Sequence, residues 1–281
     1  VLLVVCKRFF YESYRRKSKD KQFKNCKRIL LITAHPDDEC MFFGPTILEL
    51  AGDKEKYDFH ILCLSSGNFY GAGDVRKNEI KASCNILNVN RSNITIVEHT
   101  KLPDGPYRWD LNTMAHIVLK YVESLSIDTV VTFDHWGVSK HWNHRSIFYC
   151  VQNLYDRGLF PVDTQIFVLE SVSLLRKYSS FFDAFYSWTF SPFIYACDQS
   201  QVLKVRSAMI CYKSQSTWYR TLYMIFSRYV YLNTYRRISC RICRVDSRSM
   251  AAKTAIRRSS DCNSITSSSV LRRKFKSRTP T

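Results

Sequence analysis

The chain has 281 residues, of which 46% are hydrophobic, as in folded proteins and unlike disordered ones. Its formal net charge of +18 comes from the two ends: residues 1–28 carry a net +8 and residues 236–281 a net +11, which leaves −1 for residues 29–235. A neutral body argues against nucleic-acid binding, because a folded nucleic-acid-binding domain gathers positive charge on one face. We expect a basic segment over 1–28, a folded domain over 29–235, and a basic, Ser/Arg-rich, disordered tail over 236–281.

The N-terminal segment begins with VLLVV, which Lys7 and Arg8 follow at once. Five apolar residues cannot cross a bilayer, which takes about 20. They are either the last turn of a span that precedes residue 1 or a frayed chain end. Under the first reading, 1–28 is a basic juxtamembrane segment, since Lys and Arg collect on the cytoplasmic side of a span.

Short apolar segments alternate with segments of helical periodicity along the body of the chain. The expected strands are 29–34, 59–64, 94–98, 129–133 and 165–169. The expected helices are 46–51, 75–87, 111–125 and 146–155. Because strand–helix–strand repeats build parallel sheets, we expect an α/β, Rossmann-like fold with a mostly parallel sheet and helices on both faces. No GxGxxG motif follows the first strand, so a dinucleotide site is not expected.

A cluster of polar residues, His35, Asp37, Asp38 and Glu39, directly follows the first expected strand. The ordinary explanation for one carboxylate there is a helix N-terminus, which it stabilises by roughly 0.3–1 kcal/mol. A helix end does not need two adjacent aspartates beside a histidine. These residues therefore indicate a further role.

A second cluster follows the strand expected over 129–133, where TFDHWGVSKHWNHRS contains His135, His141 and His144. The carboxyl ends of parallel strands meet at one edge of a sheet, where α/β proteins bind ligands. A single histidine is more often structural, but four of the chain's seven histidines lie beside two strand ends, which favours a metal site. Catalytic zinc takes three ligands from His and Asp or Glu and leaves a fourth position to water, which a nearby carboxylate can deprotonate.

The two clusters together resemble the zinc-dependent de-N-acetylases of the PIG-L/LmbE-like family. The resemblance runs over residues 30–233 and includes MFFGPTIL, CLSSGNFYGAGDVRKNEI, SVSLLRKY and SQSTWYRTLYMIFSRYVYLN. These further segments are similar to the branch of the family that acts in GPI-anchor biosynthesis, more than to deacetylases of small thiols or antibiotic precursors.

The resemblance implies a role for each residue that matches the family pattern. His35, Asp38 and His144 match the ligands of one divalent metal ion, expected to be Zn²⁺. Asp37 matches the general base that takes a proton from the attacking water. His141 matches the imidazole that stabilises the oxyanion and assists departure of the amine.

Two further residues match the family, and two depart from it. Arg76 and Asp104 fall where family members place substrate-contacting residues. Lys140 stands where a Gly usually precedes His141, which bears on the geometry of the loop beside a catalytic group. Tyr212 stands where close relatives carry a His, which puts any role of that His in question.

The resemblance also implies the reaction and its place. The expected substrate is N-acetylglucosaminyl-phosphatidylinositol, a glycolipid from which the enzyme removes acetate to give glucosaminyl-phosphatidylinositol, in the second step of GPI-anchor biosynthesis. The enzyme is expected at the endoplasmic reticulum membrane with its catalytic domain on the cytoplasmic face, so that the sequons at Asn90 and Asn93 stay unglycosylated. The alternatives are a deacetylase of another N-acetylglucosamine-containing substrate, or a non-catalytic sugar- or inositol-lipid-binding protein of the same fold.

Two aromatic-rich segments lie nearer the C-terminus. Residues 179–195 either line a lipid-facing mouth of the site or belong to the core. Residues 216–232 place five apolar side chains at helical spacing: Trp218, Leu222, Ile225, Phe226 and Tyr229. We expect a helix whose apolar face covers the core, with a helix lying in the membrane interface as the alternative.

Overall fold

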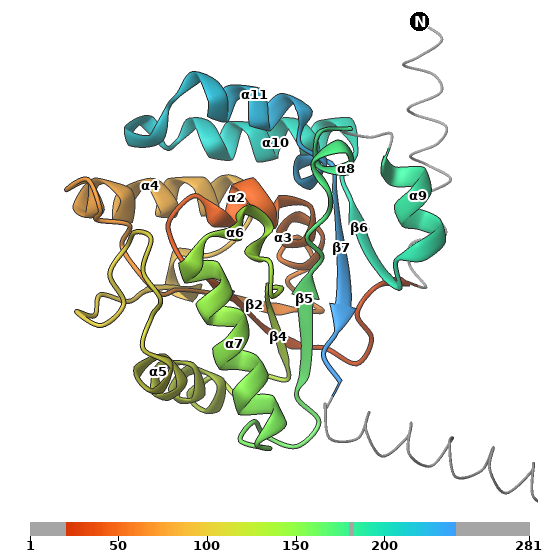
Figure 1. Cartoon of the computed structure of the whole chain (residues 1–281). Coiled ribbons are helices and arrows are strands. Elements are labelled where there is room, and N and C mark those ends of the chain that lie inside the picture. The colour runs from red at the N-terminus through yellow and green to blue at the C-terminus, as the bar shows by residue number, and fades with distance from the viewer. Residues whose placement is uncertain (1–20, 180–182, 240–281) are drawn as a thin grey trace, which may run out of the picture. The chain divides into compact units, whose positions relative to one another are not determined.

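A seven-stranded mixed sheet organises the computed structural model, which describes residues 21–179 and 183–239 (Figure 1). Its strands are β1 (Arg28–Thr33), β2 (Asp58–Cys63), β3 (Ile94–Ile96), β4 (Thr129–Phe133), β5 (Gln165–Leu169), β6 (Phe193–Ala196) and β7 (Leu232–Arg237). They lie in the order β3-β2-β1-β4-β5-β7-β6. Neighbours from β3 to β5 pair in parallel, whereas β7 runs antiparallel to both β5 and β6.

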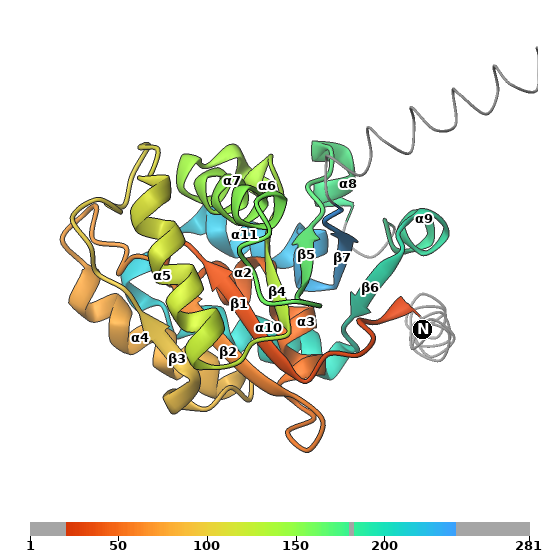
Figure 2. The same cartoon turned by 90° about the horizontal axis from the view of Figure 1, so that it is seen from below.

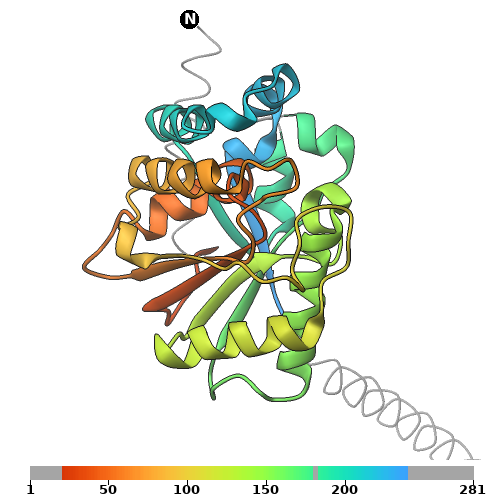
Figure 3. The same ribbon diagram turned by 90° about the vertical axis from the view of Figure 1, so that its left-hand side faces the viewer.

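Helices cover both faces of this sheet. They are α2 (Asp38–Phe42), α3 (Gly44–Leu50), α4 (Gly73–Ile86), α5 (Leu111–Ser124), α6 (Gly137–Lys140), α7 (Trp142–Asp156), α8 (Leu174–Tyr178), α9 (Asp183–Phe190), α10 (Gln199–Ile210) and α11 (Trp218–Phe226). Short 3-10 turns are η2 (Arg91–Asn93), η4 (Lys213–Gln215) and η5 (Arg228–Val230). Figures 2 and 3 show α5 and α7 on one face and α3, α4 and α10 on the other.

The predicted α/β fold with a mostly parallel sheet is confirmed. All five predicted strands are present, and each begins and ends within two residues of its expected bounds. The central residues of these strands are apolar on both faces of the sheet, as parallel strands between two helix layers require. In β1, the side chains of Ile29 to Ile32 are all buried, and β4 is buried throughout.

The folded part of the chain exceeds the expected 29–235 domain at both ends. Phe23 is buried and stacks on Phe167 of β5, with ring centroids 3.8 Å apart. At the other end, β7 continues to Arg237. Residues 1–20 and 240–281, with VLLVV and most of the predicted disordered tail, lie outside the described residues.

Helix α11 corrects one expectation. Tyr223 and Met224 point into the protein and are buried, as is Tyr229 in η5. The other four residues of the predicted apolar face are 42–76% exposed: Trp218, Leu222, Ile225 and Phe226. The prediction that this face covers the core is therefore wrong for four of its five residues.

None of the helices within 21–179 and 183–239 has both the length and the hydropathy needed to traverse a bilayer.

The strand order places the loops that carry the predicted site. After β1 the chain adds β2 and β3 on one side of this strand, and it then adds β4 and β5 on the other side. The carboxyl ends of the neighbouring strands β1 and β4 are therefore the topological switch point of the sheet. The loops after these two strands contain the two histidine-rich clusters, so the fold brings them to one edge.

Candidate metal and catalytic site

The loop after β1 holds a strained residue at the site. Asp37 has φ = 99°, a left-handed conformation that costs a residue other than glycine about 1–3 kcal/mol and is concentrated at functional sites. Neighbouring carboxylates hold this loop: Asp38 Oδ2 accepts from the N–H groups of Ala34 and His35 at 2.9 Å, and Glu39 Oε2 accepts from the Asp37 N–H at 3.0 Å. The acidic cluster therefore shapes its own loop.

Glu39 lies behind this loop and gives the unexpected Tyr212 a partner. Its Oε1 accepts hydrogen bonds from Ser83 Oγ at 2.6 Å and from the Tyr212 hydroxyl at 2.7 Å. Burial raises the pKa of Glu39 to about 7, against these two hydrogen bonds, which favour the charged form. Tyr212 thus supports the carboxylate that holds Asp37.

The loop after β4 is shaped by a buried aspartate and by left-handed residues. Asp134 Oδ1 accepts from the Gly137 N–H at 3.0 Å and from Ser171 Oγ at 2.6 Å, which joins this loop to the one after β5. Gly137 has φ = 61°, and a Cβ there would lie 2.8 Å from His144 Cβ. Lys140 has φ = 62°, so this lysine adopts the left-handed conformation that glycine favours at the position where the family pattern has a Gly.

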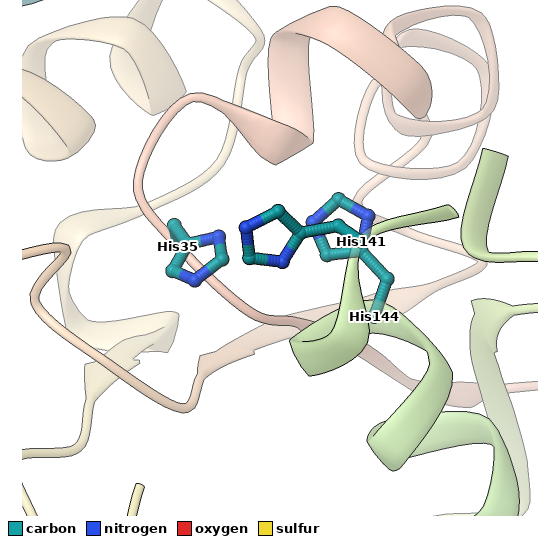
Figure 4. A group of neighbouring side chains, drawn as sticks. All are labelled: His35, His141 and His144. Atoms are coloured by element: carbon teal, nitrogen blue, oxygen red, sulfur yellow. The ribbon is translucent and has the colours of Figure 1, made fainter. Parts of the chain in front are cut away.

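Three histidines converge where the two loops meet (Figure 4). His35 follows β1, while His141 caps α7 and His144 lies in its first turn. Each offers one ring nitrogen, and these three atoms lie within 4.8 Å of one another. His135 does not join them, because its ring packs 5.1 Å from the Trp136 ring instead.

His144 presents a lone pair to Asp38. Its Nδ1 lies 3.0 Å from the carbonyl oxygen of Gly137, to which it must donate. In the neutral ring Nε2 then carries a lone pair, and this atom lies 3.2 Å from Asp38 Oδ1. A hydrogen bond to a carbonyl on the far nitrogen is the usual arrangement of a metal-binding histidine.

His35 is oriented in the same way by two acceptors. Its Nε2 lies 3.0 Å from Asp104 Oδ1 and 2.9 Å from Asn143 Oδ1. The Asn143 amide nitrogen donates to the Tyr107 carbonyl, which turns the amide oxygen toward His35. The ring proton therefore belongs on Nε2, and the lone pair on Nδ1 lies 3.9 Å from Asp38 Oδ2.

These donor atoms fit a divalent cation. When both rings are neutral, the lone pairs of His35 Nδ1 and His144 Nε2 face the Asp38 carboxylate, and no ring proton lies between these atoms and the carboxylate oxygens. Around tetrahedral zinc, bonds of about 2.0–2.2 Å separate the ligand atoms by roughly 3.3–3.6 Å. Asp38 Oδ1 lies 3.2 Å from His144 Nε2, close to that range, and the other carboxylate oxygen, Oδ2, lies 3.9 Å from His35 Nδ1. His35, Asp38 and His144 could hold such an ion.

Electrostatics keeps the carboxylates of this group charged. Burial favours the neutral form of Asp38, but the positive charge that His144 and His35 carry when they are protonated outweighs it and holds the pKa of Asp38 far below its usual range. Burial likewise opposes ionisation of Asp104, yet His35 and then Arg76 lower its pKa to about 2. In return, the pKa of His35 is raised, because its hydrogen bond to Asp104 and the charge of Asp38 outweigh burial.

His141 differs from the other two histidines. Its Nδ1 accepts a hydrogen bond from the Asn143 N–H at 3.3 Å, which puts the proton of the neutral ring on Nε2. Burial, and then the neighbouring His144 and His35, lower its pKa to about 4. His141 therefore presents a neutral N–H donor to the cluster, where His35 and His144 present lone pairs.

Asp37 binds two arginines. Its Oδ2 lies 3.2 Å from Arg76 Nη2 and 2.5 Å from Arg220 Nη1. Burial raises the pKa of Asp37, and Arg220 and Arg76 oppose that rise. Arg76 also donates to the Gly67 carbonyl at 2.8 Å and lies 3.6 Å from Asp104, so both predicted substrate-contacting residues lie in this site, bound to protein groups.

Two residues of the site, Asn143 and Arg220, lie within the sequence motifs, but the sequence alone gives them no role. Asn143 lies between His141 and His144, where only its spacing from a histidine marks it. Arg220 lies in α11 and reaches Asp37 across 183 positions of sequence. No local pattern identifies such a partner.

Comparison with known proteins identifies the family. The family model described as GlcNAc-PI de-N-acetylase (PIG-L) matches residues 30–155. The N-acetylglucosaminyl-phosphatidylinositol de-N-acetylase of Bos taurus is 42% identical over 209 residues, which cover 74% of this chain and 82% of that protein. A probable enzyme of the same name from Schizosaccharomyces pombe is 35% identical over 217 residues, covering 74% and 86%.

A solved structure shares the fold at low identity. The N,N'-diacetylchitobiose deacetylase from Pyrococcus horikoshii matches with a TM-score of 0.55 and 18% identity, over 82% of this chain and 92% of that one. The resemblance seen in the sequence is confirmed by these relatives, and the chain belongs to the PIG-L family of GlcNAc-PI de-N-acetylases.

Proposed function

We propose that the protein hydrolyses the acetamide of N-acetylglucosaminyl-phosphatidylinositol, which releases acetate and leaves glucosaminyl-phosphatidylinositol. Family membership supports this substrate, since the relatives from Bos taurus and Schizosaccharomyces pombe are named for it. One observation carries the mechanism: the adjacent aspartates have different partners. Asp38 faces His35 and His144, while Asp37 faces Arg76 and Arg220.

His35, Asp38 and His144 are the proposed ligands of one divalent ion, for which we propose zinc. When bound, such an ion polarises a carbonyl and lowers the pKa of water toward about 7. The His141 ring nitrogen lies within 4.8 Å of those of His35 and His144, but its neutral ring carries the proton on Nε2, and we propose that it acts as a donor instead of a ligand.

The remaining chemistry belongs to the chain's own side chains. Asp37 takes a proton from the attacking water as the water oxygen bonds to the acetyl carbon. Both arginines bind its Oδ2, which leaves Oδ1 to take that proton. His141 donates from Nε2 to the carbonyl oxygen as that oxygen becomes negative. When the carbon–nitrogen bond breaks, the proton on Asp37 passes to the sugar nitrogen, and acetate and a free amine result.

Acetate release from N-acetylglucosaminyl-phosphatidylinositol tests the proposal. A chelator should abolish release, and added zinc should restore it. Replacing His35, Asp38 or His144 by Ala should lower metal content and activity together. Full metal occupancy in all three variants would rule out this ligand set. Acetate release from soluble N-acetylglucosamine derivatives alone would favour another substrate, and substrate binding without any release would favour the non-catalytic alternative.

We also propose a place for the reaction, the cytoplasmic face of the endoplasmic reticulum membrane, with 1–28 as a basic juxtamembrane segment and 236–281 as a basic tail. The ten Lys and Arg residues of 1–28 support this, because such residues stay on the cytoplasmic side and are attracted to anionic lipid by about 1 kcal/mol each. Protease added to sealed microsomes should digest the body, with Asn90 and Asn93 unglycosylated. A protected, glycosylated body would reverse this orientation.

A further inference from the structure

Three short helices beside the site carry much of the protein's exposed apolar surface. In the described part of the chain, eight large apolar side chains are at least two-thirds exposed, and five of these lie on α8, α9 and α11. The five are Leu174, Leu175, Phe185, Phe190 and Trp218, which together define what we call the docking face. Single exposed apolar residues are normal, whereas such a concentration marks a binding surface.

The three helices are joined by side-chain contacts. Tyr178 of α8 packs edge-on against Tyr223 of α11, with ring centroids 6.5 Å apart. Arg176 of α8 binds Asp183 at the start of α9, with Nε and Oδ1 2.5 Å apart. Figure 1 shows α8 next to α11, with α9 to its right. These contacts join α8 to both α9 and α11, so the five side chains of the docking face lie on neighbouring helices.

The formal charge of the docking-face helices and of the chain that precedes Lys21 favours an anionic partner. Asp183 is the single acidic residue of α8, α9 and α11, and it is buried between Arg176 and Arg228. Residues 1–20 contain six Lys or Arg and two acids, and they join the described chain at Lys21. The Lys21 ammonium donates to the carbonyl oxygens of Trp188 and Ser191, at the end of α9.

The docking face also adjoins the proposed base. Arg220 of α11 binds Asp37, and the Tyr223 hydroxyl donates to the carbonyl oxygen of Met41 at 3.3 Å. One side of α11 thus contacts the site while Trp218 is exposed on the same helix.

We propose that the docking face binds the interfacial region of a lipid bilayer that contains anionic lipid. The inference rests on the proposed function, since a glycolipid substrate keeps its acyl chains in the membrane and its sugar at the surface. Exposed Trp, Phe and Leu without an exposed carboxylate, with the partly exposed Arg176 and Arg220 on the same helices, fit a surface that lies in a membrane interface. Binding there brings α11, and with it Asp37, to the level of lipid headgroups.

Vesicle co-sedimentation of the full chain tests the proposal. The vesicles contain phosphatidylcholine and phosphatidylinositol in a ratio of about 4:1, and salt at about 1 M screens the basic ends. The variants are Leu175→Asp and Trp218→Asp. The matched control is Val162→Asp, because Val162 is 92% exposed, close to the 88% of Leu175. It lies just before the first residue of β5, at the end of this strand that is opposite to the site. The three wild-type side chains are largely exposed, so unchanged thermal unfolding should accompany each substitution.

Wild type and Val162→Asp should bind these vesicles equally well. Each docking-face variant should bind at least about tenfold more weakly, because a large apolar side chain is lost from the interface. Equal binding by all four proteins would overturn the proposal. Vesicle binding by none of them, with a wild-type dimer that Leu175→Asp dissociates, would overturn it in favour of a second copy. Because the vesicles contain no substrate, acetate release measured separately shows whether the proposed function stands or fails independently.

Discussion

Replacing Arg220 by Met should slow the reaction and leave the metal ligands intact. Arg220 Nη1 lies 2.5 Å from Asp37 Oδ2, and the two side chains are 21% and 6% exposed. Methionine is unbranched and flexible, so it replaces much of the arginine stem while it removes the guanidinium. Arg76 stays 3.2 Å from the same oxygen, so Asp37 keeps one positive partner. The change therefore removes one hydrogen bond and not the whole setting of the base.

The size of the effect follows from that hydrogen bond. A hydrogen bond to a charged group contributes about 1.5–3 kcal/mol net, and each 1.36 kcal/mol is a factor of ten in rate. If the bond holds Asp37 Oδ1 in position for proton transfer, kcat/KM for acetate release should fall about 10- to 150-fold. Metal content should not change, since Arg220 contacts none of His35, Asp38 and His144.

Arg206→Met is the control for the placement of α11. Arg206 donates to the Met224 carbonyl at 3.1 Å and to the Tyr231 hydroxyl at 2.7 Å, so it supports the end of α11 without contact to Asp37. Steady-state acetate release and metal analysis of both variants should show loss of rate in Arg220→Met alone. Wild-type kcat/KM in Arg220→Met, or an equal loss in both variants, would show that the Arg220–Asp37 contact does not support the base.

The other predictions concern stability. Lys140→Gly should raise the free energy of unfolding by up to about 1 kcal/mol, because the left-handed penalty of roughly 1–2 kcal/mol exceeds the entropy cost of glycine; urea denaturation measures this, and destabilisation would contradict it. Tyr212→Phe removes a donor from the buried Glu39 and should cost about 1–3 kcal/mol, seen as a lower Tm; an unchanged Tm would contradict it. Arg228→Met removes one of the two arginines that bind the buried Asp183 and should cost about 1.5–3 kcal/mol, while the control Arg236→Met, whose arginine is 54% exposed, should cost about 0–1 kcal/mol; equal thermal shifts would contradict the difference.

The parallel half of the sheet could be read from the sequence, and the antiparallel edge could not. Strands β1 to β5 are short apolar runs between helical segments, which is the signature of parallel strands buried on both faces. In β7, by contrast, Asn233 and Thr234 are buried although polar, because Thr46 donates to the Asn233 amide oxygen and Arg228 donates to the Thr234 hydroxyl. Such partners are set by tertiary structure, so neither periodicity nor propensity marks this strand.

Helix α11 shows the same limit from the other side. Helical spacing of its apolar residues identifies a helix, but it does not say whether the apolar face meets the core or the surface. That depends on what neighbouring elements cover, and the structure leaves Trp218 and Phe226 at least half exposed.

The candidate site was partly readable for a topological reason. Residues that follow two neighbouring parallel strands must come together, so the sequence alone groups His35, Asp37, Asp38 and His144. The arrangement within the group is not readable in this way, because it depends on partners from distant elements. The hydrogen bond from the Asn143 N–H that fixes the tautomer of His141, and the ion pair of Arg220 with Asp37, are of this kind.

Asp37→Asn tests most directly whether Asp37 acts as the base while Asp38 binds the metal. Metal content and acetate release are measured on one preparation of this variant. Asparagine tolerates the left-handed backbone at this position and keeps the shape of the side chain, but its amide cannot take a proton from water. Metal content should stay at the wild-type level, while turnover should fall by about 10²- to 10⁴-fold. Loss of the metal would exchange the roles of Asp37 and Asp38, and wild-type turnover with the metal retained would contradict the mechanism outright.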